Sequence, residues 1–281
     1  MTRETHASAV RRPAGARQRL RAALRSTVLS GLGALRRGGP GRSMRFLMAH
    51  YVLDDQCRAF ERQIATLRGM GQFVTTGEAL AMVRGEAPID GSYFHLSFDD
   101  GLDCLARNAA PILDAAGITA LVFVNSALAG QPEPEERARW ERATNYAAPL
   151  SVMGWETLAQ SGFEIGAHTR THWRLSEISA DPELLKREIA GCKGEIEAAL
   201  ARPCRYFAWP FGRREDIDDP PLAAIRAAGF EASFSAIRGA AMPGRTDPFM
   251  IPRHHFEPHW PLSHLRFFLC DAGERYGTAR T

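Results

Sequence analysis

Cysteine, lysine and long apolar runs are all scarce in this 281-residue sequence. The five cysteines are scattered and never form a C-x-x-C pair, which excludes a disulfide framework or a structural zinc knuckle. Only two lysines occur, so arginine carries most of the positive charge. No apolar run approaches the roughly 18–20 residues that cross a bilayer, which excludes an integral helical membrane protein. The scattered thiols favour a reducing compartment, and we expect a cytoplasmic protein.

The overall composition is ordinary for a folded chain, but the charge is unevenly distributed. With 45% hydrophobic and 24% charged residues, the chain is neither disordered nor fibrous. Residues 1–44 contain ten of the 35 Lys and Arg residues and one of the 32 Asp and Glu residues. The remaining residues, with 25 basic and 31 acidic side chains, are mildly acidic, and we expect no nucleic-acid partner.

Residues 1–43 form a basic leader with its own apolar pattern. Large apolar residues recur at every fourth position beside Arg17, Arg21 and Arg25, as in a basic amphipathic helix; they are Leu20, Leu24, Val28 and Leu32. Two interpretations stay open. The leader is either an element that attaches peripherally to an anionic membrane at its inner surface or to an acidic partner, or it is a disordered tail or the product of a misassigned start codon upstream of Met44. A secretory signal is not indicated, because the apolar stretch 28–35 is short and ends at Arg36.

Residues 44–281 alternate short apolar runs with helical patterns, as in a parallel sheet or a βα barrel. We expect strands over 45–52, 93–98, 119–124, 163–167, 206–209, 232–234 and 250–253. We expect helices over 57–70, 75–83, 104–116, 155–161, 182–200 and 221–228, and a terminal helix from about 262. The stretch 131–150, rich in Glu, Arg and Pro, is interpreted as a surface excursion.

Two aspartates follow one of the apolar strands. Asp99 and Asp100 come directly after residues 93–98 and precede Gly101. Adjacent residues at a strand end cannot share one direction, so the two carboxylates must do different jobs, for example binding a metal and taking a proton. An Asp N-cap for the next helix is the alternative for this pair taken alone.

Two histidines follow another strand. His168 and His172 come directly after residues 163–167, and histidines four apart can offer nitrogens to one ion. Together with Asp100 they form a set of two histidines and one carboxylate. Such a set leaves coordination positions open for water and substrate, which is typical of a catalytic rather than a structural metal site.

These segments resemble the motifs of a known family. Residues 97–101 (SFDDG), 162–168 (GFEIGAH), 168–172 (HTRTH) and 207–212 (FAWPFG) are similar to the T-F-D-D-G, G-x-E-I-G-x-H, H-[ST]-x-x-H and F-A-Y-P-Y-G motifs of the polysaccharide deacetylases, also called the NodB-homology domain or carbohydrate esterase family 4. The resemblance extends from about Phe46 to Arg253. It implies a single distorted (β/α) barrel of about seven strands, formed by residues 44–281, with its site at the carboxyl ends of the strands.

The resemblance also implies roles for individual residues. A divalent metal, zinc with cobalt or nickel as alternatives, would be held by Asp100, His168 and His172. Asp99 would be the general base that takes a proton from the attacking water. The turn formed by Pro210, Phe211 and Gly212 would line the substrate groove, and the Phe211 backbone N–H would stabilise the oxyanion.

The sequence departs from the family pattern at the residues that assist the reaction. Ala208 stands where an arginine often orients the base, and Arg205 or Arg253 is the candidate replacement. The L-x-H letters at 262–264 fall in the expected terminal helix, so His255, at a predicted strand end, is assigned as the general acid.

Several further side chains are weaker candidates. His50, at the end of the first strand, lines the pocket or belongs to the core, and the strand residue His95 is expected to be structural. Three tryptophans are candidates for stacking on sugar rings, with core packing as the alternative; they are Trp155, Trp209 and Trp260.

The function implied is metal-dependent hydrolysis of an acetyl group, N-acetyl in preference to O-acetyl, on an amino sugar of a glycan or glycoconjugate. Two alternatives stay open: a hydrolase of cyclic amides or ureides on the same fold, and a catalytically silent module that binds a glycan or another partner. Asp99, Asp100, His168 and His172 weigh against silence, because a dead site has no physical need for all four.

Overall fold

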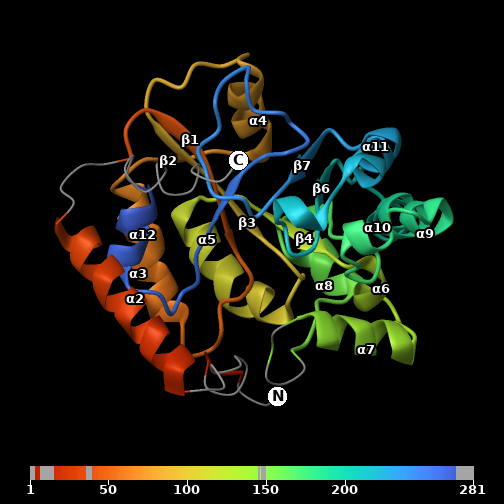
Figure 1. The fold of residues 1–281 in the computed structure, drawn as a ribbon, viewed down its shortest axis with the longest axis horizontal. Helices are drawn as coiled ribbons and strands as arrows, with labels where there is room; N and C mark the ends of the chain where they lie inside the picture. The colour runs from red at the N-terminus through yellow and green to blue at the C-terminus, as the bar shows by residue number, and fades with distance from the viewer. Residues whose placement is uncertain (1–3, 7–15, 36–39, 145, 147–149, 270–281) are drawn as a thin grey trace.

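A nearly closed parallel barrel forms the centre of the molecule (Figure 1). The computed structural model describes residues 4–6, 16–35, 40–144, 146 and 150–269. Seven strands follow the order β7-β6-β5-β4-β3-β1-β8, and the short β2 pairs with β3. A parallel bridge between Phe234 and Ile251 joins the two ends of this order. The predicted distorted (β/α) barrel is therefore confirmed. The strands are β1 (Ser43–Ala49), β2 (Gln72–Phe73), β3 (Ser92–Phe98), β4 (Ala120–Val124), β5 (Glu164–Ala167), β6 (Tyr206–Ala208), β7 (Ala232–Phe234) and β8 (Arg253–His255).

Helices surround the barrel on its outer side. They are α2 (Ala16–Leu35), α3 (Cys57–Arg68), α4 (Thr76–Arg84), α5 (Ala110–Ala116), α6 (Ser126–Ala129), α7 (Pro134–Ala143), α8 (Trp155–Gln160), α9 (Pro182–Lys186), α10 (Cys192–Leu200), α11 (Asp219–Ala227) and α12 (Leu262–Leu269). A π-helical turn precedes α5, and another joins α9 to α10. Among the described residues, no helix has both the length and the apolar content needed to span a bilayer.

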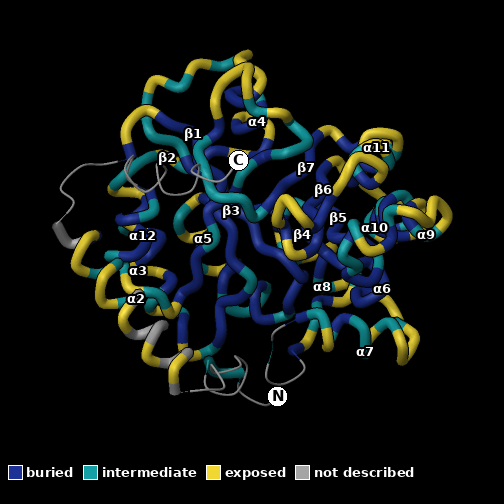
Figure 2. Tube along the Cα trace, in the orientation of Figure 1, coloured by how far each residue is buried: buried dark blue, intermediate teal, exposed yellow. Residues whose placement is uncertain are grey.

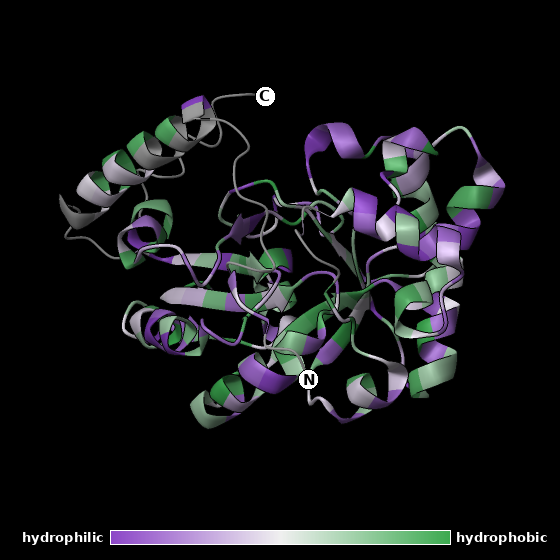
Figure 3. Cartoon of the chain, turned by 90° about the horizontal axis from the view of Figure 1, so that it is seen from below, coloured by the Kyte–Doolittle hydropathy of each residue, from purple (hydrophilic) through white to green (hydrophobic). Residues whose placement is uncertain are grey.

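Alternation along each strand divides the core into two parts. In β3, Phe94, Leu96 and Phe98 point outward and pack in the cluster under the helices. Residues of the opposite parity face the barrel interior, where Phe46, Phe123 and Phe234 form a second cluster. Both clusters are buried (Figure 2), and hydrophobic residues concentrate along the central strands (Figure 3).

Helix α4 packs against the interior cluster through Ala79, Leu80 and Val83. Its start is set by a capping box, in which the Thr75 hydroxyl accepts from the Glu78 N–H and the Glu78 carboxylate accepts from the Thr75 N–H. Because this helix closes the interior cluster near the amino ends of the strands, the site is left to the carboxyl ends.

The start of the last strand and the interpretation of 131–150 differ from the sequence predictions. The last strand starts at Arg253 rather than at 250, because the chain is still turning at 247–250, where the Met250 N–H donates to the Asp247 carbonyl. The stretch 131–150 is not a simple surface excursion, since it contains α7 and the fully buried Trp140.

Part of the basic leader forms helix α2, which packs along α12. The Ser26 carbonyl lies 3.0 Å from His264 Nε2, and a Cβ at Gly33 would collide with the backbone of Ser263. The rest of residues 1–43, apart from 4–6 and 40–43, and the final residues of the 44–281 unit lie outside the described residues. The boundary at residue 43 stays a prediction.

Candidate active site

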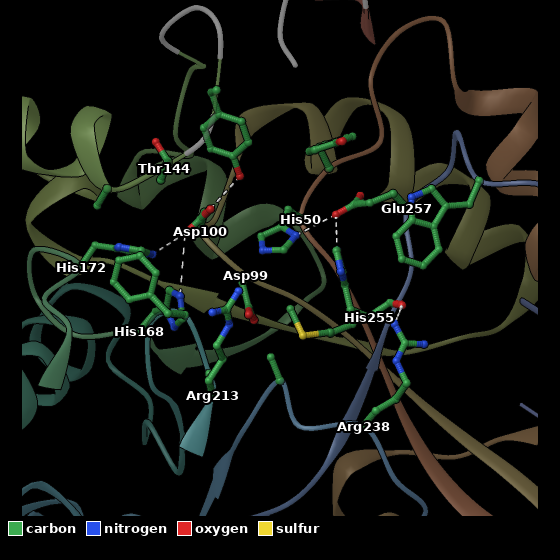
Figure 4. A pocket seen from close by; sticks show the side chains of 18 of the residues that line it. His50, Asp99, Asp100, Thr144, His168, His172, Arg213, Arg238, His255 and Glu257 are labelled. Atoms are coloured by element: carbon green, nitrogen blue, oxygen red, sulfur yellow. Dashed lines mark hydrogen bonds and ion pairs between the residues drawn. The ribbon is translucent and has the colours of Figure 1, made fainter. Parts of the chain in front are cut away.

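A cavity of about 530 Å³ opens at the carboxyl ends of the strands (Figure 4). Two groups of side chains lie on either side of Asp99 in this cavity. We call one group the ligand triad, which consists of Asp100, His168 and His172. We call the other the Glu257 cluster, which consists of His50, His255 and Glu257.

The ligand triad brings three potential metal ligands together in a buried position. Their ligand atoms all lie within 4.8 Å of one another. Asp100 Oδ1 is 3.4 Å from His172 Nε2 and 3.8 Å from His168 Nε2. Burial opposes ionisation of Asp100, but the adjacent His172 imidazole keeps the pKa of this carboxyl well below its usual range. The three side chains predicted from the sequence are therefore adjacent in space.

Left-handed backbone conformations aim these side chains. Among the described non-glycine residues, five have a positive φ. Three of them, Asp100, His172 and Phe211, line the cavity, and a fourth, Thr169, lies in the loop between the two triad histidines. Such conformations cost roughly 1–3 kcal/mol each and persist only where surrounding structure holds them. At Asp100 the left-handed turn explains how two adjacent aspartates take separate directions.

Buried hydrogen bonds hold the loop between the two histidines. His168 Nδ1 lies 2.8 Å from the Ala208 carbonyl, which assigns the proton to Nδ1 and leaves Nε2 free to act as a ligand. Burial, the largest influence, lowers the pKa of His168 to about 4, so the ring is neutral at neutral pH. Both the backbone N–H and the hydroxyl of Thr171 donate to the buried Glu188 carboxylate, each at 2.8 Å.

The triad fits a divalent metal ion. Asp100 Oδ1 is buried and has no hydrogen-bond partner among the described residues. A buried charged oxygen without a donor is costly unless something else compensates it. Two imidazole nitrogens and one carboxylate are a donor set typical of catalytic zinc sites, and cobalt and nickel accept the same ligands.

Asp99, at the end of β3, is held by an arginine of β8, the next strand but one in the barrel. Arg253 Nη1 and Nη2 donate to the two Asp99 oxygens at 2.7 and 2.9 Å, and both residues are buried. Burial opposes ionisation of Asp99, but the electrostatic attraction of the Arg253 guanidinium, assisted by His168, outweighs burial and lowers the pKa of Asp99. Asp99 is therefore an oriented carboxylate that is ionised at neutral pH.

In the Glu257 cluster, two histidines share one carboxylate oxygen. Glu257 Oε1 lies 2.8 Å from His50 Nδ1 and 2.8 Å from His255 Nε2. Burial favours the neutral form of His50, but hydrogen bonding and charge attraction from Glu257 raise its pKa to about 9. The same contacts overcome burial to lower the pKa of Glu257 to about 2. The cluster therefore holds a proton on imidazole at neutral pH.

The turn at 210–212 forms a wall of the cavity. Phe211 is 37% exposed, and its ring stands edge-on to His172 at a centroid distance of 5.2 Å. Gly212 has φ +72°, and a Cβ there would lie 2.5 Å from the Ala236 nitrogen. This position therefore requires glycine for both its conformation and its space. Pro210 is buried behind the turn and is not among the residues that line the cavity.

Comparison with known proteins assigns the chain to a family. The family model "Polysaccharide deacetylase" matches residues 87–233, just over half of the chain. This chain belongs to the polysaccharide deacetylase family. The matched residues include both aspartates, both histidines of the triad and the 210–212 turn.

Other comparisons agree with this family assignment. The Bacillus subtilis (strain 168) protein YxkH, classed with the polysaccharide deacetylases, is 22% identical over 185 residues, which are 66% of this chain and 59% of YxkH. The structure of IcaB from Ammonifex degensii is 25% identical, with a TM-score of 0.66 over 82% of this chain and 97% of that one. A de-N-acetylase from Aggregatibacter actinomycetemcomitans has the same fold, with 17% identity and a TM-score of 0.64 over 80% of this chain and 99% of that one.

The structure decides between the two arginines proposed to replace the missing motif arginine of the family. Arg253 contacts Asp99 directly. Arg205 is largely exposed and pairs with Glu231 at 3.6 Å. The arginine that contacts Asp99 in this chain therefore comes from β8 instead of the segment before Pro210.

Two pocket residues were missed by sequence reasoning. Tyr146 donates a hydrogen bond to Asp100 Oδ2 at 2.7 Å from the stretch interpreted as a surface excursion. No local pattern identifies it. Glu257 could have been found, because it lies two residues after His255, and strand alternation places such residues on one face.

The weaker candidates separate into pocket and core. Trp260 lines the pocket, whereas Trp209 is fully buried and Trp155 packs against the outer core cluster. His95 is structural, as expected: it is buried against Thr76, and its pKa is lowered to about 3 by burial and then by Arg253. His264 lies in α12 and contacts Ser26 instead of the pocket.

Proposed function

We propose that this chain is a metal-dependent hydrolase that removes an acetyl group from an amino sugar of a glycan or glycoconjugate. The observation that carries the proposal is the buried ligand triad beside Asp99 in a cavity of about 530 Å³. A cavity of this size accommodates a ligand of the size of one or two sugar rings. Membership of the polysaccharide deacetylase family supports the same class of reaction.

The triad would hold the metal through Asp100 Oδ1, His168 Nε2 and His172 Nε2. When bound, a divalent cation supplies Lewis-acid chemistry, which acidifies water and polarises an acyl oxygen. Tyr146 keeps Asp100 oriented by donating to the carboxylate oxygen that the triad does not use.

Asp99 acts as the general base that takes a proton from the attacking water. Its bidentate contact with Arg253 fixes the carboxylate plane and keeps it ionised at neutral pH. The backbone N–H of Phe211, at the cavity wall, supplies a fixed donor for the negative charge that develops on the acyl oxygen.

We assign the general acid to the Glu257 cluster and place the proton on His50 instead of His255. Both histidines line the cavity and both contact Glu257 Oε1. The charges of Asp100 and Asp99 add to that of Glu257 in raising the pKa of His50. That proximity favours proton delivery from His50 to a leaving group bound over the triad. In this proposal His255 orients Glu257 through their hydrogen bond, instead of acting as the general acid that the sequence predicts.

A protonated imidazole favours an N-acetyl substrate over an O-acetyl substrate. An amine leaves the tetrahedral intermediate of hydrolysis only after its nitrogen is protonated, whereas an alkoxide leaves with less assistance. A histidine with a pKa raised to about 9 is charged at neutral pH and can donate that proton. Trp260, whose ring stands edge-on to His255 at 5.2 Å, offers a surface for a sugar ring.

Two alternative functions are weakened by specific contacts. A silent binding module would be consistent with the missing motif arginine and with the absence of a well-placed L-x-H histidine, and the Arg253–Asp99 pair removes the first of these two reasons. A tryptophan exposed in the pocket suits a sugar ring, and Trp260 lines the pocket, which argues against a hydrolase of cyclic amides or ureides.

The experiment is acetate release from a panel of N-acetylated and O-acetylated glycans, with a cyclic ureide as the comparison substrate. Protein stripped by a chelator should lose hydrolysis, and zinc, cobalt or nickel should restore it. Full hydrolysis by protein that elemental analysis shows to be metal-free would overturn the metal assignment. Hydrolysis of the ureide alone would establish the rival function.

A further inference from the structure

Helix α2 places a row of large apolar side chains in solvent. Among the described residues, six large hydrophobic side chains are exposed, and four of them follow one another along this helix at exposures of 43 to 71%; they are Leu20, Leu24, Val28 and Leu32. We call these four residues the α2 stripe. At 100° per residue, four positions spaced by four cover about a third of the helix circumference.

The opposite side of α2 already has a partner. Ser26 and Gly33 contact α12 through His264 and Ser263. On the helix circumference both residues fall outside the sector of the α2 stripe. The α2 stripe is therefore not the face by which this helix packs on the rest of the molecule, because that face contacts α12 (Figure 1).

The charge of α2 indicates which kind of partner the α2 stripe would bind. The 20-residue helix contains four arginines and no acidic residue; they are Arg17, Arg19, Arg21 and Arg25. The positions of Arg17 and Arg21 share the sector of the stripe, and that of Arg25 lies at its border. The one acidic residue of the leader, Glu4, is paired with Arg107 at 2.7 Å and does not neutralise them.

We propose that α2 binds the chain peripherally to an anionic lipid bilayer. Interleaved leucines and arginines suit an interface in which apolar side chains enter the acyl region while guanidinium groups meet anionic headgroups. A second copy of the chain fits less well, because it would bring two helices with four arginines each against each other. A nucleic acid would use the arginines but leave the leucines in water.

The location of α2 connects this surface to the pocket. Trp260, at the cavity wall, has its ring centroid 6.3 Å from that of His264, and His264 contacts Ser26 of α2. A bilayer under the stripe would therefore lie one helix layer away from the cavity wall. Glycans attached to the membrane, or close to it, would be concentrated at the pocket.

The test is cosedimentation of the full chain with vesicles of phosphatidylcholine containing about 30% phosphatidylglycerol, and with pure phosphatidylcholine vesicles. We expect pelleting with the anionic vesicles only, decreasing as salt is raised. The double variant Leu24→Glu/Val28→Glu should reduce the bound fraction at least about tenfold. Met242→Glu, at an exposed hydrophobic side chain outside α2, is the matched control and should bind like the unchanged chain.

Three results would overturn the proposal. The first is no pelleting with anionic vesicles, and the second is equal pelleting of the double variant and the control. The third is a dimer in light scattering that dissociates in the double variant, which would make the stripe a self-association surface. Thermal unfolding of each variant verifies that the fold is retained, and no outcome depends on the hydrolytic activity.

Discussion

The ligand triad and the Glu257 cluster each contain two histidines and one carboxylate, yet they hold charge in different ways. The triad is buried, its histidines come from one short loop, and its Asp100 Oδ1 has no hydrogen-bond partner among the described residues. In the Glu257 cluster both histidines are about a third exposed, and both contact one carboxylate oxygen at 2.8 Å. In the ligand triad the lone pairs of three ligand atoms converge, as the binding of a metal ion requires. In the Glu257 cluster the carboxylate oxygen is already hydrogen-bonded to both histidines.

The comparison teaches that residue type alone does not identify a metal site. A neutral His168, with its pKa lowered to about 4, and a donor-free carboxylate suit a cation. A charged His50, with its pKa raised to about 9, suits proton transfer instead. The hydrogen bonds within each group therefore favour a metal ion at the ligand triad and proton transfer at the Glu257 cluster.

The largest effect is expected from substitutions of the adjacent aspartates. Asp99→Asn should lower kcat by about 10²–10⁴-fold while the protein still binds metal, because the base is lost and the triad is intact. Asp100→Asn should lower metal affinity and activity together. Metal content and acetate release are measured side by side, with thermal unfolding as a control because Arg253 loses its anionic partner. Reversed behaviour of the two variants would exchange their roles.

The next effect separates the two histidines of the Glu257 cluster. His50→Gln should lower kcat about 10²-fold at pH 7, whereas His255→Gln should stay within about tenfold of the unchanged enzyme. The two substitutions are matched in size and in their shared partner, Glu257. Acetate release at saturating substrate measures both. A larger loss in His255→Gln would restore His255 as the acid, as the sequence predicts.

A smaller effect concerns pH. Activity should fall as pH rises above about 9, because His50 loses the proton it donates. Glu257→Gln removes the charge that raises this pKa, so the alkaline limb should move to lower pH and kcat/KM should fall more at pH 8 than at pH 6. Glu215→Gln, an exposed acid that pairs with the pocket residue Arg213, is the control and should leave the profile in place. An unmoved limb in Glu257→Gln would remove the cluster from acid catalysis.

The smallest effect is expected at Tyr146. Tyr146→Phe deletes the hydroxyl that donates to Asp100 Oδ2, and the metal dissociation constant should rise about tenfold with kcat unchanged at saturating zinc. Tyr51→Phe is the control, because Tyr51 lines the same cavity next to the Tyr146 ring. Equal metal affinity in both variants would show that the hydroxyl does not support the triad.

The sequence predicts the local parts of this molecule well and the long-range parts poorly. Alternation and turn residues identify the barrel strands, and the strand-end motifs identify both aspartates and the two triad histidines. Each such motif is completed within a few residues. The contacts that complete the site join positions far apart, as with Asp99 and Arg253 or His50 and Glu257. Periodicity shows which face a side chain occupies, but not which strand becomes its neighbour when the barrel closes.

The contact between Asp99 and Arg253 of the last strand sets the order in which parts of the site are completed during synthesis. Chains leave the ribosome from the N-terminus, so the triad residues are made first and Arg253 follows His172 by 81 residues. Until β8 joins β1, the Asp99 carboxylate has no guanidinium to offset its burial. A chain that ends before β8 would carry the proposed metal ligands but lack the arginine that orients the proposed base. The strand that completes the barrel is also the one that would complete the proposed site.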